Sequence, residues 1–171
     1  GAVFGQDANK AKIAAADMFS VLDRPSAIDA MQTEQSASAK RFAADQPLHI
    51  RFEAVRFAYP HRPEVTVLAG FTLDVPPETT LALVGPSGSG KSTISQLLQR
   101  FYDVADGSLV VGVDEVVGRR VVPLKELDIE WWRAQLGFVG QEPVLFDATL
   151  EENVKYGKPD ATQEELDAVA K

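Results

Sequence analysis

The sequence contains no cysteine, which excludes a disulfide scaffold and any metal site built on thiolates. It also lacks a long apolar run. The longest plain apolar stretches, residues 14–16 and 81–84, are far shorter than the roughly 20 residues that span a bilayer. The first residues show no basic segment followed by an apolar one, so they do not resemble a signal peptide. We therefore expect a water-soluble polypeptide.

Basic residues are outnumbered as well. Lys and Arg total 17 against 25 Asp and Glu, which gives a net charge of −8 and an isoelectric point of about 4.8. A surface that coats nucleic acid is basic, so we expect no nucleic-acid partner. The acidic balance still permits phosphate binding, because backbone N–H groups and a single lysine can form a local anion pocket.

The character of the chain changes near residue 45. Residues 1–44 are rich in Ala, Ser, Asp and Gln. An apolar face over residues 10–22 predicts a helix there, and the polar remainder predicts a mobile linker. From residue 45 onward, alternating apolar positions at 48–52 and 55–59, and apolar segments at 65–68 and 71–75, predict strands. We predict a linker, 1–44, followed by a domain, 45–171.

The rest of the domain alternates between predicted strands and helices. Continuous apolar runs at 81–84 and 137–139 predict buried strands, and the Asp-Gly pair at 106–107 predicts a turn into the apolar segment 109–111. Helices are predicted over 91–102, over 126–136 and from residue 163, where Thr162 is the candidate N-cap.

The strongest motif is GPSGSGKS at residues 85–92, which fits G-x-x-x-x-G-K-[ST] at every fixed position. Glycines let successive backbone N–H groups face inward, and the positive end of the following helix adds to the field. Lys91 supplies a full charge for the β- and γ-phosphates, and the Ser92 hydroxyl can coordinate Mg²⁺. We predict phosphate binding by Ser87, Gly88, Ser89, Gly90, Lys91, Ser92 and Thr93.

Two further segments flank this loop. VRFAYPHRP at 55–63 precedes it, and LGFVGQEPVLF at 136–146 follows it. In this order the three segments resemble the A-loop, P-loop and Q-loop of ABC exporters of the multidrug-resistance, P-glycoprotein-like type. The resemblance implies that Tyr59 stacks on adenine. It also implies that Gln141 reaches the Mg²⁺ and the γ-phosphate side and relays the nucleotide state to the membrane domain.

Residues 7–24 resemble the segment that joins the last transmembrane helix of such exporters to their nucleotide-binding domain. The family resemblance implies an α/β fold: a P-loop NTPase core with an N-terminal antiparallel β subdomain, preceded by a helical linker. It implies ATP and Mg²⁺ as cofactors, with Lys91 and Gln141 as catalytic residues. The implied partners are the transmembrane domain of the same protein and a second nucleotide-binding domain, at the cytosolic face of a membrane.

The sequence departs from the family pattern in two respects. Residues 115–123 look inserted, and we expect a surface loop there. No LSGGQ-like signature, no apolar strand ending in Asp-Glu and no switch histidine follow the Q-loop, since His49 and His61 both precede the phosphate loop. Hydrolysis needs a metal, a positioned nucleophile and charge stabilisation together. We therefore expect these 171 residues to bind ATP at most, with apolar sheet edges left exposed.

Three other classes of function share part of this pattern. A soluble ABC-type ATPase of DNA repair or translation would contain the same loop, but the segment before Tyr59 and the acidic charge argue against it. A small-molecule kinase with a P-loop offers no role for Tyr59 or Gln141. A non-catalytic interaction module that retains nucleotide is the remaining alternative.

Overall fold

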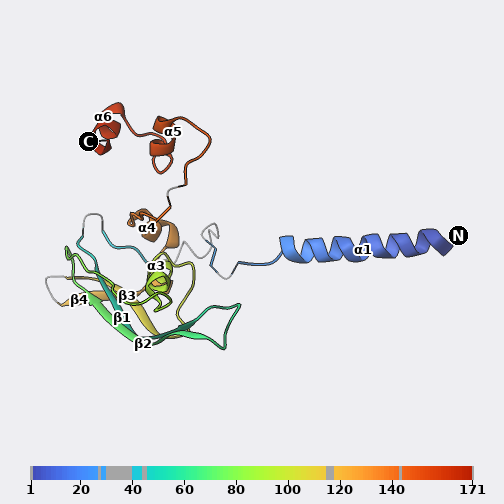
Figure 1. The fold of residues 1–171 in the computed structure, drawn as a ribbon, viewed down its shortest axis with the longest axis horizontal. Coiled ribbons are helices and arrows are strands. Elements are labelled where there is room, and N and C mark those ends of the chain that lie inside the picture. Colours follow the sequence, from blue (N-terminus) through green and yellow to red (C-terminus); the bar gives the residue numbers. More distant parts are fainter. Residues whose placement is uncertain are drawn as a thin grey trace. The chain divides into compact units, whose positions relative to one another are not determined.

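The computed structural model describes residues 2–26, 28–29, 40–43, 46–114, 118–142 and 144–170. The chain divides into two compact units, residues 1–136 and residues 137–171. The first unit contains α1 Ala2–Leu22, β1 His49–Ala58, β2 Thr66–Val75, α3 Lys91–Leu98, β3 Asp106–Asp114, β4 Arg119–Pro123, the 3-10 turn η1 Leu124–Glu126 and α4 Ile129–Ala134 (Figure 1). The second unit contains α5 Leu150–Lys155 and α6 Gln163–Val169.

The predicted helix at residues 10–22 is present, as the second part of the longer α1. Its described side chains, from residue 9 onward, are exposed, and they include Phe19 and Leu22. Over the described part of the chain, no helix combines the length and the apolar character that crossing a membrane requires.

A four-stranded antiparallel sheet in the order β2-β1-β3-β4 forms the frame of the first unit (Figure 1). The two strand segments predicted at 48–52 and 55–59 are one strand, β1, with a register shift at Ala54, whose φ is 47°. The extra residue of this bulge turns Phe52, Val55 and Phe57 toward the same face, and all three are buried. Gly107 lies opposite, where an added Cβ would come within 2.5 Å of the Ala54 carbonyl oxygen.

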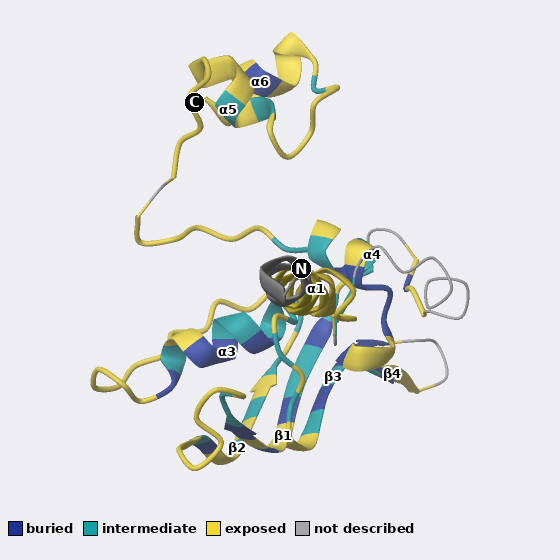
Figure 2. Ribbon diagram, turned by 90° about the vertical axis from the view of Figure 1, so that its right-hand side faces the viewer, coloured by how far each residue is buried: buried dark blue, intermediate teal, exposed yellow. Residues whose placement is uncertain are grey.

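The core of this unit lies between one face of the sheet and α3 (Figure 2). Helix α3 contributes Ile94 and Leu97, and α4 contributes Trp132. The sheet and its following turn contribute the remaining large set of buried side chains: Phe52, Val55, Phe57, Leu68, Leu109, Val111, Val113, Val122, Leu124 and Leu127. Burial of this apolar surface stabilises the unit and fixes α3 against the sheet.

The segment expected as an inserted surface loop, residues 115–123, contributes a strand instead. Its last five residues form β4, which pairs antiparallel with β3 and sets Val122 opposite Val111. Val122 is only 2% exposed, so this strand adds a side chain to the core. A loop was expected because the segment looked inserted relative to the family pattern, but pairing with β3 satisfies its backbone groups. Arg119 lies on the open face of the sheet, and Arg120 lies over the Phe42 ring. Residues 115–117 lie outside the described residues.

Two segments predicted as buried strands are exposed coil. Residues 81–84 and 137–139 have no strand structure, and Val84 and Val139 are 89% and 95% exposed. An apolar run becomes a strand only when its backbone groups find partners in a neighbouring strand. None of the described strands pairs with either segment. The apolar residues therefore indicated a tendency to be buried without identifying a partner.

The predicted helices are present but shorter. Helix α3 ends at Leu98, and the segment 126–136 contains the end of η1 and the short α4. The predicted N-cap of α6 is confirmed, because the Thr162 hydroxyl accepts from the Glu165 N–H at 3.3 Å while the Glu165 carboxylate accepts from the Thr162 N–H at 3.0 Å. This reciprocal pair depends on local spacing only, which is why the sequence was sufficient to predict it.

The end of the expected mobile linker is packed against the first unit. Lys40 forms a parallel bridge with Leu127, and Phe42 is 4% exposed beside Trp131. The structure corrects the linker prediction for residues 40–43, whose apolar and charged side chains find partners around α4. Residues 30–39 lie outside the described residues.

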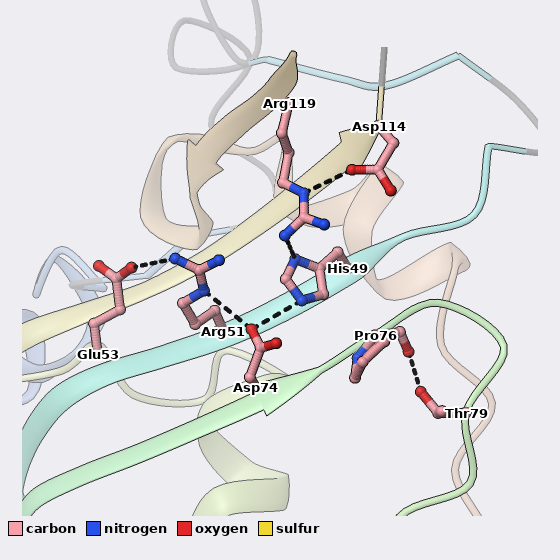
Figure 3. Close-up of polar contacts among 8 residues, drawn as sticks. All are labelled: His49, Arg51, Glu53, Asp74, Pro76, Thr79, Asp114 and Arg119. Carbon is pink, nitrogen blue, oxygen red and sulfur yellow. Dashed lines mark hydrogen bonds and ion pairs between the residues drawn. The ribbon is translucent and has the colours of Figure 1, made fainter. Parts of the chain in front are cut away.

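The other face of the sheet carries polar contacts that cross all four strands (Figure 3). Arg119 on β4 donates from Nε to Asp114 at 2.7 Å, and its Nη1 lies 2.7 Å from His49 Nδ1. The Nε2 atom of His49 lies 2.9 Å from Asp74, which also accepts from Arg51 at 3.0 Å. Since Nδ1 accepts from an arginine, the His49 proton is assigned to Nε2, which donates to Asp74.

These contacts predict a loss of stability in acid. The hydrogen bond from Arg119 holds the pKa of Asp114 below its ordinary value of 3.8. A carboxyl whose pKa is lowered by folding stabilises the folded state above its ordinary pKa, and this contribution is lost as the pH falls through the folded pKa. We expect the free energy of unfolding to decrease below about pH 4. Urea unfolding between pH 7 and pH 3 measures this.

The matched variants for this prediction are Asp114→Asn and Glu64→Gln. Asp114→Asn removes a carboxyl bonded to Arg119, whereas Glu64→Gln removes an exposed one in the turn before β2. Asp114→Asn is expected to be less stable at pH 7 and to lose less stability on acidification than the wild type. Identical pH dependence in all three proteins would contradict the assignment.

Candidate nucleotide-binding site

The phosphate loop leads directly into the first turn of α3. Gly90 is the N-cap of this helix, with φ 89° and no side-chain cap. The first helical hydrogen bond runs from the Ile94 N–H to the Gly90 carbonyl at 3.1 Å. The N–H groups of residues 91–93 therefore have no acceptor within the helix. Together with the positive end of the helix, they form a site suited to an anion.

Gly90 also allows the loop to approach β2 closely. A Cβ at this position would lie 3.0 Å from Leu68 Cδ2 and 3.4 Å from Val67 Cγ1. Both contacts are tighter than ordinary van der Waals separations, and the backbone conformation is one that other residues rarely adopt. The motif therefore needs glycine at this position for two reasons: the positive φ angle and the close contact with β2.

The ammonium group of Lys91 lies inside the loop. Its Nζ donates to the carbonyl oxygens of Gly85 and Pro86, both at 2.7 Å, and lies 3.3 Å from Ser89 Oγ. A phosphate oxygen is a stronger acceptor for a charged donor than a neutral carbonyl is. The loop contains no carboxylate that would repel an anion. Its donors and its single charge fit a phosphate chain.

The donors for a metal ion are fewer. Ser92 is exposed in the first turn of α3 and offers a hydroxyl oxygen, a ligand type that Mg²⁺ accepts. The described residues hold no group of three or more His, Asp or Glu side chains able to bind a metal. This set fits an ion that arrives with phosphates as its main ligands, as Mg²⁺ does in nucleotide sites. Gln141 is exposed and belongs to the second unit.

Tyr59 directly follows β1 and is tied to the phosphate-loop helix. Its hydroxyl donates to Gln96 Oε1 at 2.8 Å and lies 2.9 Å from Thr93 Oγ1. Its ring meets Phe57 and Tyr102 edge to face, with centroids 5.1 and 5.3 Å apart. The His61 ring lies 5.5 Å from the Tyr59 ring at an interplanar angle of 35°, so three rings surround this side chain and hold it in place. The structure thus brings the predicted base-stacking residue to the helix that the phosphate loop opens.

The Thr93 side chain differs from its predicted role, and two further residues around Tyr59 were not predicted. Thr93 was predicted to bind phosphate, but its side chain is 3% exposed and its hydroxyl contacts Tyr59. Its backbone N–H remains in the open first turn. Gln96 and Tyr102 were not singled out from the sequence. The spacing of Gln96, three residues after Thr93 on the same helix face, was the available signal.

In the second unit, Asn153 of α5 fixes the segment that follows the Q-loop. Its side-chain oxygen accepts from the Phe146 N–H at 2.8 Å, and its Nδ2 donates to the Thr149 carbonyl at 2.9 Å. The rings of Phe146 and Tyr156 stack at 4.3 Å. Thr149 caps α5 in a reciprocal pair with Glu152. No role for Asn153 was predicted, because its contacts depend on how the loop folds back.

A glycine-rich loop that opens a helix, encloses a lysine and is followed by a serine hydroxyl defines a P-loop nucleotide-binding protein. Residues 68–171 match the ABC transporter family. The chain therefore belongs to the ABC transporter family, and the observed antiparallel sheet and the likeness to a solved ABC exporter confirm the predicted α/β fold.

Similar proteins are consistent with the exporter type that the motifs suggested. The chain is 42% identical over 169 residues to ABC transporter B family member 2 of Dictyostelium discoideum, covering 98% of this chain and 11% of that protein. It is 42% identical over 156 residues to Multidrug resistance protein homolog 65 of Drosophila melanogaster, covering 91% and 11%. It superposes on a bacterial Atm1-family ABC exporter solved with ATP bound, with a TM-score of 0.75 and 31% identity, covering 95% of this chain and 26% of that one. The chain spans about a tenth of the length of the curated relatives it matches.

Proposed function

We propose that this chain is the ATP-binding portion of an ABC exporter that couples ATP binding and hydrolysis to transport across a membrane. The observation that carries the proposal is the connection between Tyr59 and α3. One helix holds the phosphate-binding loop at its start and, through Thr93 and Gln96, the aromatic ring suited to a purine. A base platform and an anion site are thereby held at fixed positions relative to each other.

Each predicted residue has a role in this proposal. The ring of Tyr59 offers a face for adenine, and Lys91 moves its hydrogen bonds from the Gly85 and Pro86 carbonyls to the β- and γ-phosphates. The phosphates are held by Ser87, Gly88, Ser89, Gly90, Lys91, Ser92 and Thr93. Bound Mg²⁺ neutralises phosphate charge, and Ser92 and Gln141 are its proposed protein ligands.

We further propose that these 171 residues bind ATP without hydrolysing it. No apolar strand that ends in an acidic pair follows the Q-loop in these residues, and the Asp114–Glu115 pair after β3 precedes the Q-loop, with Asp114 bonded to Arg119. They therefore lack the expected acidic ligand and base for the attacking water. In this proposal ATP is hydrolysed only by the complete parent protein, whose transmembrane domain and second nucleotide-binding domain are the partners at the cytosolic face of a membrane. The exposed apolar side chains of the second unit, among them Leu145, Leu150 and Tyr156, support burial against such partners.

The test compares Tyr59→Leu, Tyr59→Phe and the wild type by titration calorimetry with Mg-ATP and with Mg-tripolyphosphate. Stacking on a base contributes about 1–3 kcal/mol, so Tyr59→Leu is expected to weaken Mg-ATP binding about tenfold. Tyr59→Phe keeps the ring and loses only the bonds to Thr93 and Gln96, so its loss should be smaller. Tripolyphosphate lacks a base, and its affinity should be unchanged in Tyr59→Leu.

Two results would contradict the proposal. The first is a wild-type chain that binds neither ligand. The second is an equal loss of Mg-ATP and tripolyphosphate affinity in Tyr59→Leu, which would mean that Tyr59 supports the fold of the loop and not the base. Phosphate release measured on the wild-type preparation is expected to stay at the background rate.

A further inference from the structure

Helix α4 holds the end of α3 that is opposite to the phosphate loop. Trp132 Nε1 donates to the Leu98 carbonyl at 2.6 Å. Arg133 donates from Nε to the Gln99 carbonyl and from Nη2 to the Arg100 carbonyl, both at 3.1 Å. The last carbonyls of a helix have no donors within the helix, and they carry its negative end. Trp132 supplies a donor to the last carbonyl of α3, and the charged, forked Arg133 side chain bonds the carbonyls of the two residues that follow the helix, where its charge faces the negative end.

The helix end itself adopts a conformation that needs support. Arg100 has φ 52°, and the N–H groups of Arg100 and Phe101 return to the Leu97 and Gln96 carbonyls, both at 3.0 Å. This closing turn usually carries glycine at the left-handed position. Here the Arg100 side chain donates from Nη1 to the Leu127 carbonyl at 3.3 Å. Contacts therefore run in both directions between the end of α3 and the segment that begins α4.

The segment of residues 40–43, here called the strap, is fastened to the start of α4. The Asp128 N–H donates to the Lys40 carbonyl at 3.0 Å, and Arg41 bonds the Asp128 carboxylate at 2.7 Å. The same carboxylate caps α4 by accepting from the Trp131 N–H at 2.7 Å. The buried Phe42 ring lies 6.1 Å from the Trp131 ring. Any shift of the strap therefore acts on the first turn of α4.

We propose that Arg133 is a positioning residue of the nucleotide site, and that the strap, α4 and α3 form one mechanical unit linking the phosphate loop to residues 40–43. This inference rests on the proposed function. Helix α3 is eight residues long, with its phosphate-loop donors at one end and Arg133 and Trp132 at the other. In so short a helix, releasing one end lets the whole element tilt and reorients the N–H groups of its first turn. Coupling of this kind is reciprocal, so nucleotide binding must also act on the strap.

The first test uses the full chain and its two tryptophans. Trp132 reports on the end of α3 and Trp131 on the strap, and their indole N–H signals are assigned with Trp→Phe variants. During titration with Mg-ATP, both signals are expected to shift with the dissociation constant measured by calorimetry. Arg133→Ala is expected to bind Mg-ATP about tenfold more weakly than the wild type. Arg133→Lys keeps the charge, so its loss of affinity should be smaller. Indole signals that stay fixed while ATP binds would overturn the link to the strap.

The control is Arg119→Ala, which removes an arginine with two short hydrogen bonds on the open face of the sheet. Its Mg-ATP affinity should equal that of the wild type, measured at a temperature where circular dichroism shows all variants folded. Phe42→Ala tests the strap, and its effect on affinity should be non-additive with that of Arg133→Ala. If Arg133→Ala lowers only thermal stability and binds Mg-ATP like the wild type, Arg133 is a structural residue and the proposal is wrong.

Amide hydrogen exchange of the nucleotide-free chain separates this inference from the proposed function. Arg133→Ala is expected to speed exchange in residues 85–93 about tenfold relative to Arg119→Ala. If the wild type binds no Mg-ATP, the proposed function fails, and the exchange result alone decides the positioning role. Faster exchange in the loop would then support it, and unchanged exchange would overturn it.

Discussion

Replacing Lys91 with alanine is expected to weaken Mg-ATP binding by at least about 100-fold, because two charge-assisted hydrogen bonds to phosphate are lost. The ammonium group lies 2.7 Å from the Gly85 and Pro86 carbonyls, so it is already inside the space that the loop encloses. No other lysine or arginine occurs in residues 85–92 to replace it. Titration calorimetry of the wild type and the variant measures the effect.

The matched control for this prediction is Lys125→Ala, which removes the same charge from an exposed lysine in η1. Its affinity for Mg-ATP should equal that of the wild type, which would exclude a general effect of net charge. Undiminished binding by Lys91→Ala would show that the loop does not hold the phosphates. Binding lost in both variants would point to a nonspecific electrostatic attraction.

Gly90→Ala is expected to have the second largest effect, because it acts on both the backbone and the packing of the phosphate loop. A non-glycine residue at φ 89° is disfavoured by roughly 1–2 kcal/mol. In addition, the new methyl group would meet Leu68 Cδ2 at 3.0 Å and Val67 Cγ1 at 3.4 Å. We expect a lower midpoint of thermal unfolding and Mg-ATP binding weakened about tenfold or more.

Gly118→Ala provides the comparison for the backbone contribution alone. Gly118 has a similar φ of 85°, and an added Cβ there meets nothing within 4 Å. Both variants should therefore lose stability through the backbone conformation, with Gly90→Ala losing more because of the contact with β2. Only Gly90→Ala should lose nucleotide affinity. Equal losses of stability in Gly90→Ala and Gly118→Ala would show that β2 accommodates the added methyl group at no cost.

The phosphate loop could be predicted because its chemistry is local. Its glycines, Lys91 and Ser92 lie within eight consecutive residues, and the helix that follows has a clear apolar face. The role of Tyr59 came from a resemblance, and its anchoring to Thr93 and Gln96 could not be predicted. Those contacts join residues 34 and 37 positions apart, which no local pattern encodes.

The failed predictions share one physical cause. The apolar run at 81–84 was predicted to be a buried strand and is exposed, whereas the segment holding Val122 was predicted to be a loop and is a paired strand. Both have strand-forming residues, and what separates them is the presence of a neighbour. Val122 lies opposite Val111 on β3, and none of the described strands lies beside residues 81–84.

By itself, the sequence determined the features that depend on spacing within a few residues: the phosphate loop, the alternation of β1 and the capping pair of Thr162 with Glu165. Only the tertiary structure decided which apolar runs are buried and which side chains of β1 face the core after the bulge at Ala54. It also decided that Arg133 reaches the end of α3. The reason is that backbone pairing and burial belong to two segments at once. A single segment specifies its own conformational preference and leaves its partner to the fold.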